Sequence, residues 1–367
     1  VAAAMAAGVT RDHVRLNGAG VADDRGKFDE TLVPKGARFT FEIAIDDPQD
    51  GEMDRVLGAL GPIRLGGRTR RGFGVFGIVR VLVRRFDLRI EGDREDWARL
   101  PRALEAGVPE GVLKDRLSPE SVRPPCVVTA TIEIEPEDYW MFGGGVASLD
   151  EHVVGDKAHD MVPVTEPVIR WNSQTGQGTV GPDPSYVIPA SGVKGALAHR
   201  TALHYRRLTE QWHPVPGGDP PEEGWSAATR PPELHVLFGS IRNREGGVPG
   251  RVFVGDVYPE ESDSRPAGRE GPRSGALAHV SIDRFTQGPV DGHLFTEAPL
   301  YGGGFRLEMA VDTRGEVDPN VKKAFRLALE DLVEGRLAIG AGGNRGHGFC
   351  RGKVKWDDEG KWIGGEA

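Results

Sequence analysis

Residues 279–311 read HVSIDRFTQGPVDGHLFTEAPLYGGGFRLEMAV, and residues 13–45 read HVRLNGAGVADDRGKFDETLVPKGARFTFEIAI. Both segments begin with His-Val, pass through a glycine-containing turn and end in a run whose apolar residues alternate. Such alternation is typical of half-buried strands, here expected at 39–45 and 305–311. We interpret the two segments as copies of one structural repeat that is offset by 266 positions (279 minus 13).

Each copy continues with a predicted helix, at 52–60 or 321–333, and then with a glycine loop. The loops are GGRTRRGFG at 66–74 and GGNRGHG at 342–348. Glycine lets backbone N–H groups approach a phosphate, and arginine adds charge-assisted hydrogen bonds. The alternative is that the glycines only permit tight turns. Because the loop is repeated in the same context, we favour anion binding by Arg68, Arg70, Arg71, Gly72, Asn344, Arg345 and His347.

Only the second copy has a long preceding portion, with a predicted strand at 127–135 and a turn into a helix at 197–207. We therefore predict the C-terminal half of a first domain at 1–85, a linker at 86–121, a complete domain at 122–357 and a tail at 358–367. Half a sheet does not close by itself. We expect the missing half on a separate chain or on a longer form of this one.

The composition is that of a globular protein, with 38% hydrophobic and 28% charged residues and no apolar run of membrane-spanning length. Two cysteines form neither a disulfide framework nor a zinc motif, which favours the cytoplasm. The net charge of -9 argues against a uniformly basic nucleic-acid binder. Between Arg64 and Arg85, however, seven arginines occur without an acidic residue, so an anion is expected to dock there.

The segment Ile188–Leu197, IPASGVKGAL, predicts a helix start with Ser191 as its cap. Free amides at the start of this helix, together with Lys194 and Arg200, would face an anion. The alternative is an ordinary capped helix with a solvated lysine. Residues 251–256 are assigned to the core, or Asp256 orients a loop.

A stretch of acids and histidines precedes that helix, at Asp150, Glu151, His152, Asp156, His159 and Asp160. Carboxylates and imidazoles ligate cations and transfer protons. Their spacing is irregular, so we assign no metal site.

Several segments, taken in order along the chain, resemble the RAMP superfamily of CRISPR-associated proteins, in particular the backbone subunits of type III effectors. They are the IPASGVKG segment, Leu237–Gly239, Arg251–Asp256, the Val280–Leu294 stretch and the glycine loops. The resemblance implies an α+β class with RRM-like, modified ferredoxin-like domains, one complete and one partial. It also implies binding of guide RNA (crRNA) and target RNA, together with other CRISPR effector subunits or domains and without a membrane. Residues 283–294 match a thumb that wedges between bases, with Arg284, Phe285 and Val290 as candidate contacts.

Some members of this family cleave target RNA with an aspartate at the position where this chain has Thr165. A hydroxyl is not an equivalent general base, and Glu166 or Asp160 would have to replace the aspartate. We expect no intrinsic cofactor, and Mg²⁺ or another divalent ion only if cleavage occurs. A further alternative is a guide-processing endoribonuclease that uses His347 or His199.

Overall fold

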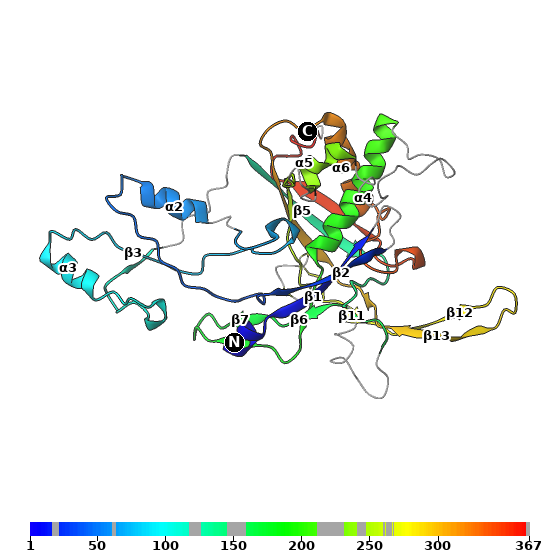
Figure 1. The fold of residues 1–367 in the computed structure, drawn as a ribbon, viewed down its shortest axis with the longest axis horizontal. Helices are drawn as coiled ribbons and strands as arrows, with labels where there is room; N and C mark the ends of the chain where they lie inside the picture. Colours follow the sequence, from blue (N-terminus) through cyan, green and yellow to red (C-terminus); the bar gives the residue numbers. More distant parts are fainter. Residues whose placement is uncertain are drawn as a thin grey trace. The chain divides into compact units, whose positions relative to one another are not determined.

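The computed structural model describes residues 1–16, 22–60, 64–116, 126–144, 159–210, 231–240, 247–259, 261, 266 and 268–364 (Figure 1). The chain forms two compact units that are not sequential. Unit 1 comprises residues 1–36, 70–72 and 126–367, and unit 2 comprises residues 37–69 and 73–125. This division differs from the predicted linear boundaries at 85 and 122, because the start of the chain packs with the C-terminal part.

A four-stranded antiparallel sheet forms the centre of unit 1, in the order β10-β15-β5-β16. Its strands and two long helices follow one another along the chain as β5 (Val127–Pro136), α4 (Ala190–Thr209), β10 (Val252–Val254), β15 (Phe305–Asp312), α6 (Pro319–Val333) and β16 (Cys350–Trp356). This βαββαβ order, with the first and third strands central, is the ferredoxin-like arrangement. The predicted α+β fold class is confirmed.

Helices α4 and α6 pack against each other and cover one face of the sheet (Figure 1). The alternating residues of β15 that face them are buried, as are those of β5, whereas the opposite face carries polar side chains. Helix α6 begins at Pro319, two residues before the predicted start at 321, because the Asp318 carboxylate accepts a hydrogen bond from the Asn320 amide and proline follows the cap.

Smaller elements surround this core within unit 1. Two hairpins are formed by β1 (Val9–Leu16) with β2 (Ala22–Leu32) and by β12 (Leu277–Ile282) with β13 (Pro289–Glu297). Short pairs link β6 (Thr165–Glu166) to β9 (Ser185–Tyr186), β7 (Ile169–Trp171) to β8 (Gly178–Val180) and β11 (Arg273–Ser274) to β14 (Leu300–Tyr301). The remaining helical pieces are α1 (Ala2–Ala7), η4 (Pro232–Leu234), α5 (His235–Phe238) and η6 (Gly343–Arg345).

The segment predicted as a tail also belongs to this core. Ile363 is buried in it, and Trp362 packs against it. Its apolar residues explain the difference from the prediction.

Unit 2 contains α2 (Glu52–Leu60), β3 (Val81–Val83), α3 (Glu91–Ala98), η2 (Leu104–Ala106) and β4 (Lys114–Arg116). The segment predicted as a linker, 86–121, therefore holds a helix and a strand that pairs with β3. The 3-10 turn η1 (Thr69–Arg71) lies where the chain passes between the units.

The strand predicted at 39–45 is absent, and this prediction was wrong. Its counterpart β15 is a strand because β5 and β10 supply hydrogen-bond partners on both edges. Alternating apolar residues do not make a strand without such neighbours.

None of the helices in the described ranges is long and apolar enough to cross a membrane.

Candidate nucleic-acid interface

The two hairpins have the same register, as the sequence repeat predicts. His13 is opposite Phe28 in the first, and His279 is opposite Phe295 in the second. In each case the two rings stack, with centroids 5.1 Å and 5.0 Å apart. The pairing then shifts at the same point of both hairpins, between Val14 and Leu16 and between Val280 and Ile282. One local design is therefore used twice.

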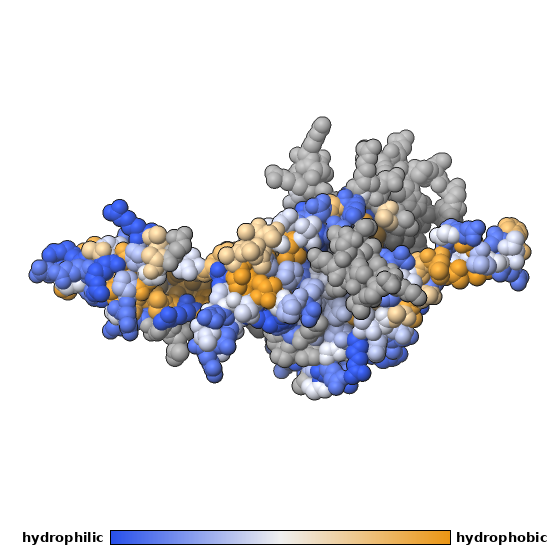
Figure 2. All heavy atoms as spheres, turned by 90° about the horizontal axis from the view of Figure 1, so that it is seen from below, coloured by the Kyte–Doolittle hydropathy of each residue, from blue (hydrophilic) through white to orange (hydrophobic). Residues whose placement is uncertain are grey.

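Each hairpin also exposes three apolar side chains, and the two on its first strand are at equivalent positions. They are Val14, Leu16 and Phe28 in the first hairpin, and Val280, Ile282 and Leu294 in the second. Apolar atoms are visible on the β12–β13 hairpin at the right of Figure 2. A narrow ribbon with an exposed apolar side contacts another molecule more readily than it remains solvated.

The tip of the second hairpin is a turn held by Asp283. Its carboxylate accepts hydrogen bonds from the amides of Thr286 and Phe285, and the Thr286 amide contributes most to the lowered pKa of Asp283. This turn leaves the Phe285 side chain 84% exposed, with the Arg284 guanidinium 5.3 Å from the ring centroid. Val290, the other predicted wedge residue, lies in β13, is half-buried and exposes less of its side chain than Phe285 does. Residues 17–21 of the first tip lie outside the described residues.

The two glycine loops close in the same way. In each loop, a backbone amide donates to the carbonyl of the last glycine, from Leu65 to Gly74 at 2.9 Å and from Ile339 to Gly348 at 3.0 Å. Each loop contains one 3-10 turn, η1 or η6. The first loop therefore aligns with the second at an offset of 274 (339 minus 65), not with the GG pairs superposed as the sequence suggested.

The shifted alignment has a stereochemical reason. It places Arg68 at the position of Gly342, and both residues have left-handed backbone angles, with φ of 54° and 77°. A non-glycine residue seldom adopts this conformation, so sequence comparison paired the glycines instead. Arg71 now corresponds to Arg345, and Arg70 corresponds to Asn344.

The second loop is tied to the base of the β12–β13 hairpin through Glu297. This fully buried carboxylate accepts hydrogen bonds from Arg345 Nη2 at 2.7 Å and pairs with His279 Nε2 at 2.7 Å. His347 is buried nearby, with Nδ1 3.9 Å from the carboxylate, whereas Asn344 is exposed. Of the three predicted RNA contacts in this loop, Asn344 is the most accessible, whereas one nitrogen of the Arg345 guanidinium is bound to Glu297.

Part of the first loop is inserted into unit 1. The Arg70 guanidinium donates to the Gly250 carbonyl at 2.6 Å and lies over the Phe253 ring. The Lys194 ammonium is buried and donates to the carbonyls of Arg70 and Val252, at 3.0 Å and 2.6 Å. Lys194 thus holds the loop in place, in contrast to the solvent-facing position expected for a phosphate contact.

Arg68 and Arg71 lie on the exposed side of this loop. Gly72 is enclosed, and a Cβ atom there would lie 2.6 Å from the Cβ of Ala190 and clash with Asp256.

The start of α4 already faces an anion that the protein itself provides. Asp256 accepts a hydrogen bond from the Ala190 amide at 2.7 Å through Oδ1 and from Arg11 at 2.8 Å through Oδ2. The helix begins at Ala190, seven residues before the predicted start, and the Ser191 side chain does not cap it. The suggested loop-orienting role of Asp256 agrees with this geometry.

Glu166 lies in the same buried network. Its carboxylate accepts hydrogen bonds from Arg11 Nε at 2.6 Å and from the Tyr258 hydroxyl at 2.9 Å. Burial and the two carboxylates raise the pKa of Tyr258, so this hydroxyl stays protonated and keeps donating. Burial opposes the charge on Arg11, yet Asp256 and Glu166 outweigh it and raise the pKa of Arg11.

A carboxylate enclosed in this way neutralises a cation and is not open to substrate. Sequence reasoning missed Arg11 and Tyr258, because nothing local in the sequence links them to Glu166. Asp160, the other candidate general base, accepts from the Thr296 amide at 2.7 Å and is exposed beside β13. In the described ranges no group of three His, Cys, Asp or Glu residues is placed to hold a metal ion. Asp150, Glu151, His152 and Asp156 lie outside the described residues.

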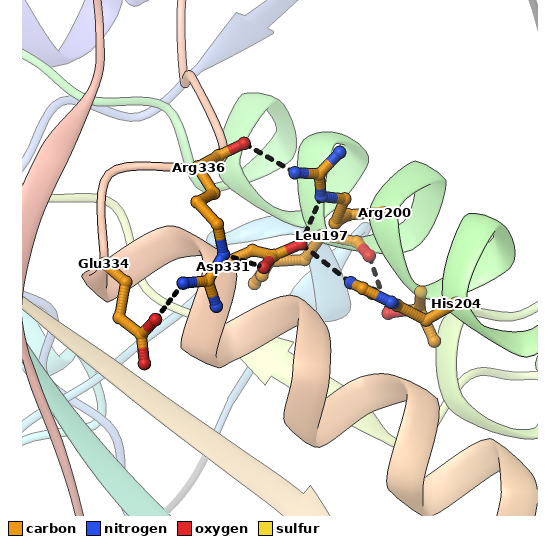
Figure 3. Close-up of polar contacts among 7 residues, drawn as sticks. Leu197, Arg200, His204, Asp331, Glu334 and Arg336 are labelled. Carbon is orange, nitrogen blue, oxygen red and sulfur yellow. Dashed lines mark hydrogen bonds and ion pairs between the residues drawn. The ribbon is translucent and has the colours of Figure 1, made fainter.

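Arg200 belongs to a separate cluster between α4 and α6 (Figure 3). Asp331, a buried residue of α6, accepts from Arg200 Nε at 2.5 Å, His204 Nε2 at 2.7 Å and Arg336 Nε at 2.6 Å. Burial alone would raise the pKa of Asp331, but the hydrogen bonds from these three cationic or imidazole groups lower it. Arg200 therefore joins two helices. Its guanidinium is bound to Asp331 within the protein, in contrast to the RNA contact that was predicted for it.

The predicted contacts divide into two groups. The exposed residues are Arg68, Arg70, Arg71, Arg284, Phe285, Asn344 and Arg345, of which Arg70 also donates to the Gly250 carbonyl and Arg345 also pairs with Glu297. The other group is buried or half-buried, and comprises Gly72, Ser191, Lys194, Arg200 and His347.

Comparison with known proteins supports the resemblance for part of the chain. Residues 175–351 match the family model described as RAMP superfamily. This segment includes α4, β10, the β12–β13 hairpin, β15, α6 and the second glycine loop. The RAMP resemblance is confirmed there, and the type III assignment stays a prediction.

No curated protein matches the chain. Among solved structures, a chain of a structure described as "Type IV-B CRISPR Complex" is similar at 16% sequence identity and a TM-score of 0.39. The similarity covers 62% of this chain and 90% of that one.

Proposed function

We propose that this protein is an RNA-binding subunit of a CRISPR effector, in which it holds a guide RNA that pairs with target RNA. The observation that carries the proposal is the duplicated combination of a hairpin and a glycine loop, within a chain whose residues 175–351 match the RAMP superfamily. Two similar binding elements in one chain suit a repeating ligand, and a nucleic-acid backbone is such a ligand.

The chemistry of the exposed residues supports RNA over a small molecule. Exposed aromatic and aliphatic side chains on the hairpins offer stacking surfaces for bases, and Arg284 beside Phe285 adds a cation at the tip. Arg71 and Asn344, whose positions differ by one residue when the two loops are aligned, offer donors to phosphate or sugar oxygens. Contacts to phosphate and sugar carry no sequence information, so sequence would be specified by pairing with the guide.

The finer assignment, a backbone subunit of a type III effector, follows from the motif resemblance and stays part of the proposal. A target-cleaving activity finds less support. Thr165 pairs with Tyr186 in a short β-ladder, and Glu166 is occupied by Arg11. The partner molecules of the proposal are crRNA, target RNA and other effector subunits.

The test is to isolate the protein in its native assembly, to sequence co-purified nucleic acid and to measure binding of the recovered RNA at several salt concentrations. Removing a stacking residue at a single-strand contact costs about 1–3 kcal/mol per base, so Phe285→Ala should weaken binding roughly 5- to 150-fold. Leu88→Ala, which removes an exposed apolar residue of unit 2, is the matched control. Absence of short RNA in the native assembly, or equal affinity of both variants, would contradict the proposal.

A further inference from the structure

An aromatic pair, Tyr139 and Tyr301, lies beside the second glycine loop and outside the buried core of unit 1. Tyr301 belongs to β14 and is 41% exposed, and its ring meets that of Tyr139 edge-on, with centroids 6.0 Å apart and planes at 80°. The centroid of the Tyr139 ring is in turn 5.8 Å from that of His347, a buried residue of the loop. One exposed ring is thus joined to the glycine loop through a second ring.

The backbone around the two tyrosines holds their rings in place. Trp140 and Leu300, which adjoin them in the chain, exchange both backbone hydrogen bonds, at 2.8 Å and 2.9 Å. The Tyr139 carbonyl also accepts from the Gly348 amide at 2.8 Å, and the Tyr139 ring lies against Gly275, where a Cβ would be 2.9 Å from Cε1. Because the pair is fixed in this way, a ligand that stacks on it orders few additional groups.

A cation lies next to the exposed ring. Arg273 is the cross-strand partner of Tyr301 in the β11–β14 pair, so the two side chains are on the same side. Its guanidinium is 67% exposed and pairs at 2.7 Å with the carboxylate of Glu270, which is 81% exposed. Hydrogen bonding to Glu270 and, to a lesser extent, the neighbouring Tyr301 hydroxyl raise the pKa of Arg273. An ion pair this exposed contributes little free energy, so a phosphate can replace the Glu270 carboxylate.

These groups together suit a nucleotide. An exposed ring offers its face to a base, and a guanidinium beside it binds a phosphate. Gly302, which follows Tyr301, and Gly346 of the loop both have positive φ, and no atom lies within 4 Å of the place where a Cβ would be, so a ligand can approach the backbone closely. The exposed residues beside the ring, Arg273 and Glu270, are charged, which favours a single base over the apolar core of a protein interface.

We propose that Tyr301 is a stacking site for one base of a single-stranded RNA segment whose backbone follows the second glycine loop, with Arg273 bound to a phosphate of the same segment. The inference rests on the proposed function and adds to it a base contact beyond the end of β13, separate from the hairpin tip. The site belongs to the second copy alone. At the offset of 266 the counterpart of Tyr301 is Lys35, whose ammonium lies over the Tyr258 ring, so the first copy has no ring at this position.

The first experiment measures the affinity of the full chain for a fluorescein-labelled oligouridylate of about 12 nucleotides by fluorescence anisotropy. Tyr301→Ala should weaken binding roughly 5- to 150-fold, because the base loses its stacking partner, whereas Tyr301→Phe keeps the ring and should bind within about twofold of the unaltered protein. Leu203→Ala, at a residue of α4 that is also 41% exposed, is the matched control and should leave the affinity unchanged.

The possible outcomes separate this inference from the proposed function. Equal affinities of Tyr301→Ala and Leu203→Ala, in a protein that binds the RNA, would overturn the stacking site alone. An equal loss in Tyr301→Ala and Tyr301→Phe would overturn it too, because the ring would not be the contact. If the unaltered protein bound no RNA, both the stacking site and the proposed function would be wrong.

Salt dependence tests the phosphate contact of Arg273. Each phosphate contact of a single strand contributes about 0.7 to the slope of log affinity against log salt concentration, so Arg273→Ala should reduce that slope by about 0.7. Glu270→Gln removes the competing carboxylate and should strengthen binding by up to about fivefold. An unchanged slope in Arg273→Ala, or weaker binding by Glu270→Gln, would contradict this contact.

Photocrosslinking locates the base and distinguishes RNA from a protein partner. An oligouridylate that contains 5-iodouridine should crosslink to the peptide that holds Tyr301, as peptide mass analysis would show, and crosslinks found only in other peptides would overturn the inference. In the native assembly, a photoreactive benzoylphenylalanine at position 301 should crosslink to RNA. A crosslink to another protein subunit, with none to RNA, would show that a protein covers Tyr301 and would also overturn the inference.

Discussion

Arg11→Met tests whether the buried network around Arg11 holds the β1–β2 hairpin to the rest of unit 1. The Arg11 side chain is 3% exposed and contacts Glu166 at 2.6 Å and Asp256 at 2.8 Å. Methionine keeps much of the apolar stem but removes the cation, so two carboxylates stay enclosed without their common partner. Removal of one member of a buried ion pair costs about 3–5 kcal/mol.

That free energy would appear mainly as local opening of the hairpin. A cost of about 3–5 kcal/mol corresponds to a roughly hundred- to few-thousandfold larger open fraction, at 1.4 kcal/mol per factor of ten. Native-state hydrogen exchange of the 9–32 amides measures it directly, and exchange in α6 reports whether the core stays intact. Arg15→Met, an exposed substitution on the same strand, should change protection by less than about 0.5 kcal/mol.

A double variant separates the charge effect from a packing defect. Glu166→Gln removes one uncompensated carboxylate, so Arg11→Met with Glu166→Gln should open less than Arg11→Met alone. If Arg11→Met and Arg15→Met gave the same exchange rates, or if the double variant opened more than the sum of the single variants, the network would not be what holds the hairpin.

Three further predictions follow from local geometry. Gly72→Ala should lower the free energy of unfolding by more than Gly66→Ala does. Both positions have positive φ, so alanine costs about 1–2 kcal/mol of backbone strain at either one, but only a Cβ at 72 meets neighbouring atoms. Equal denaturation midpoints of the two variants would refute this. Folding lowers the pKa of Asp331, so the ionised carboxylate stabilises the protein above about pH 4, and this stabilisation declines as the pH falls through the lower folded pKa. The difference in free energy of unfolding between the protein and Asp331→Asn should therefore become smaller in acid. A difference that does not change with pH would contradict this. Burial raises the pKa of the Cys350 thiol to about 12, so alkylation at pH 8 should modify Cys126 much faster, as peptide mass analysis would show; equal rates would count against that burial.

Local pattern was sufficient to predict the repeated elements. The repeat that begins with His-Val and the helix at 321–333 were predicted from alternation and periodicity, because these features depend on neighbours within a few residues. The glycine loops were recognised as equivalent for the same reason. Their correct alignment was not predicted, because Arg68 adopts a left-handed backbone conformation that is unusual for a residue other than glycine.

The roles of the charged residues depended on the tertiary structure. Lys194, Arg200 and Glu166 were predicted as exposed contacts or a catalytic base, since sequence shows a charge but not its partner. Their partners lie more than 55 residues away in the chain, at Val252, Asp331 and Arg11. Such pairings are produced by the folding of the whole sheet and its helices.

The sequence by itself determined the α+β class and the repeat of hairpin and glycine loop, because both depend on local periodicity and on the order of elements. The tertiary structure alone decided which cations face solvent and which ones hold the fold together. It also decided that residues 39–45 form no strand, because a strand needs neighbours on its edges and the chain places β5 and β10 beside the other copy.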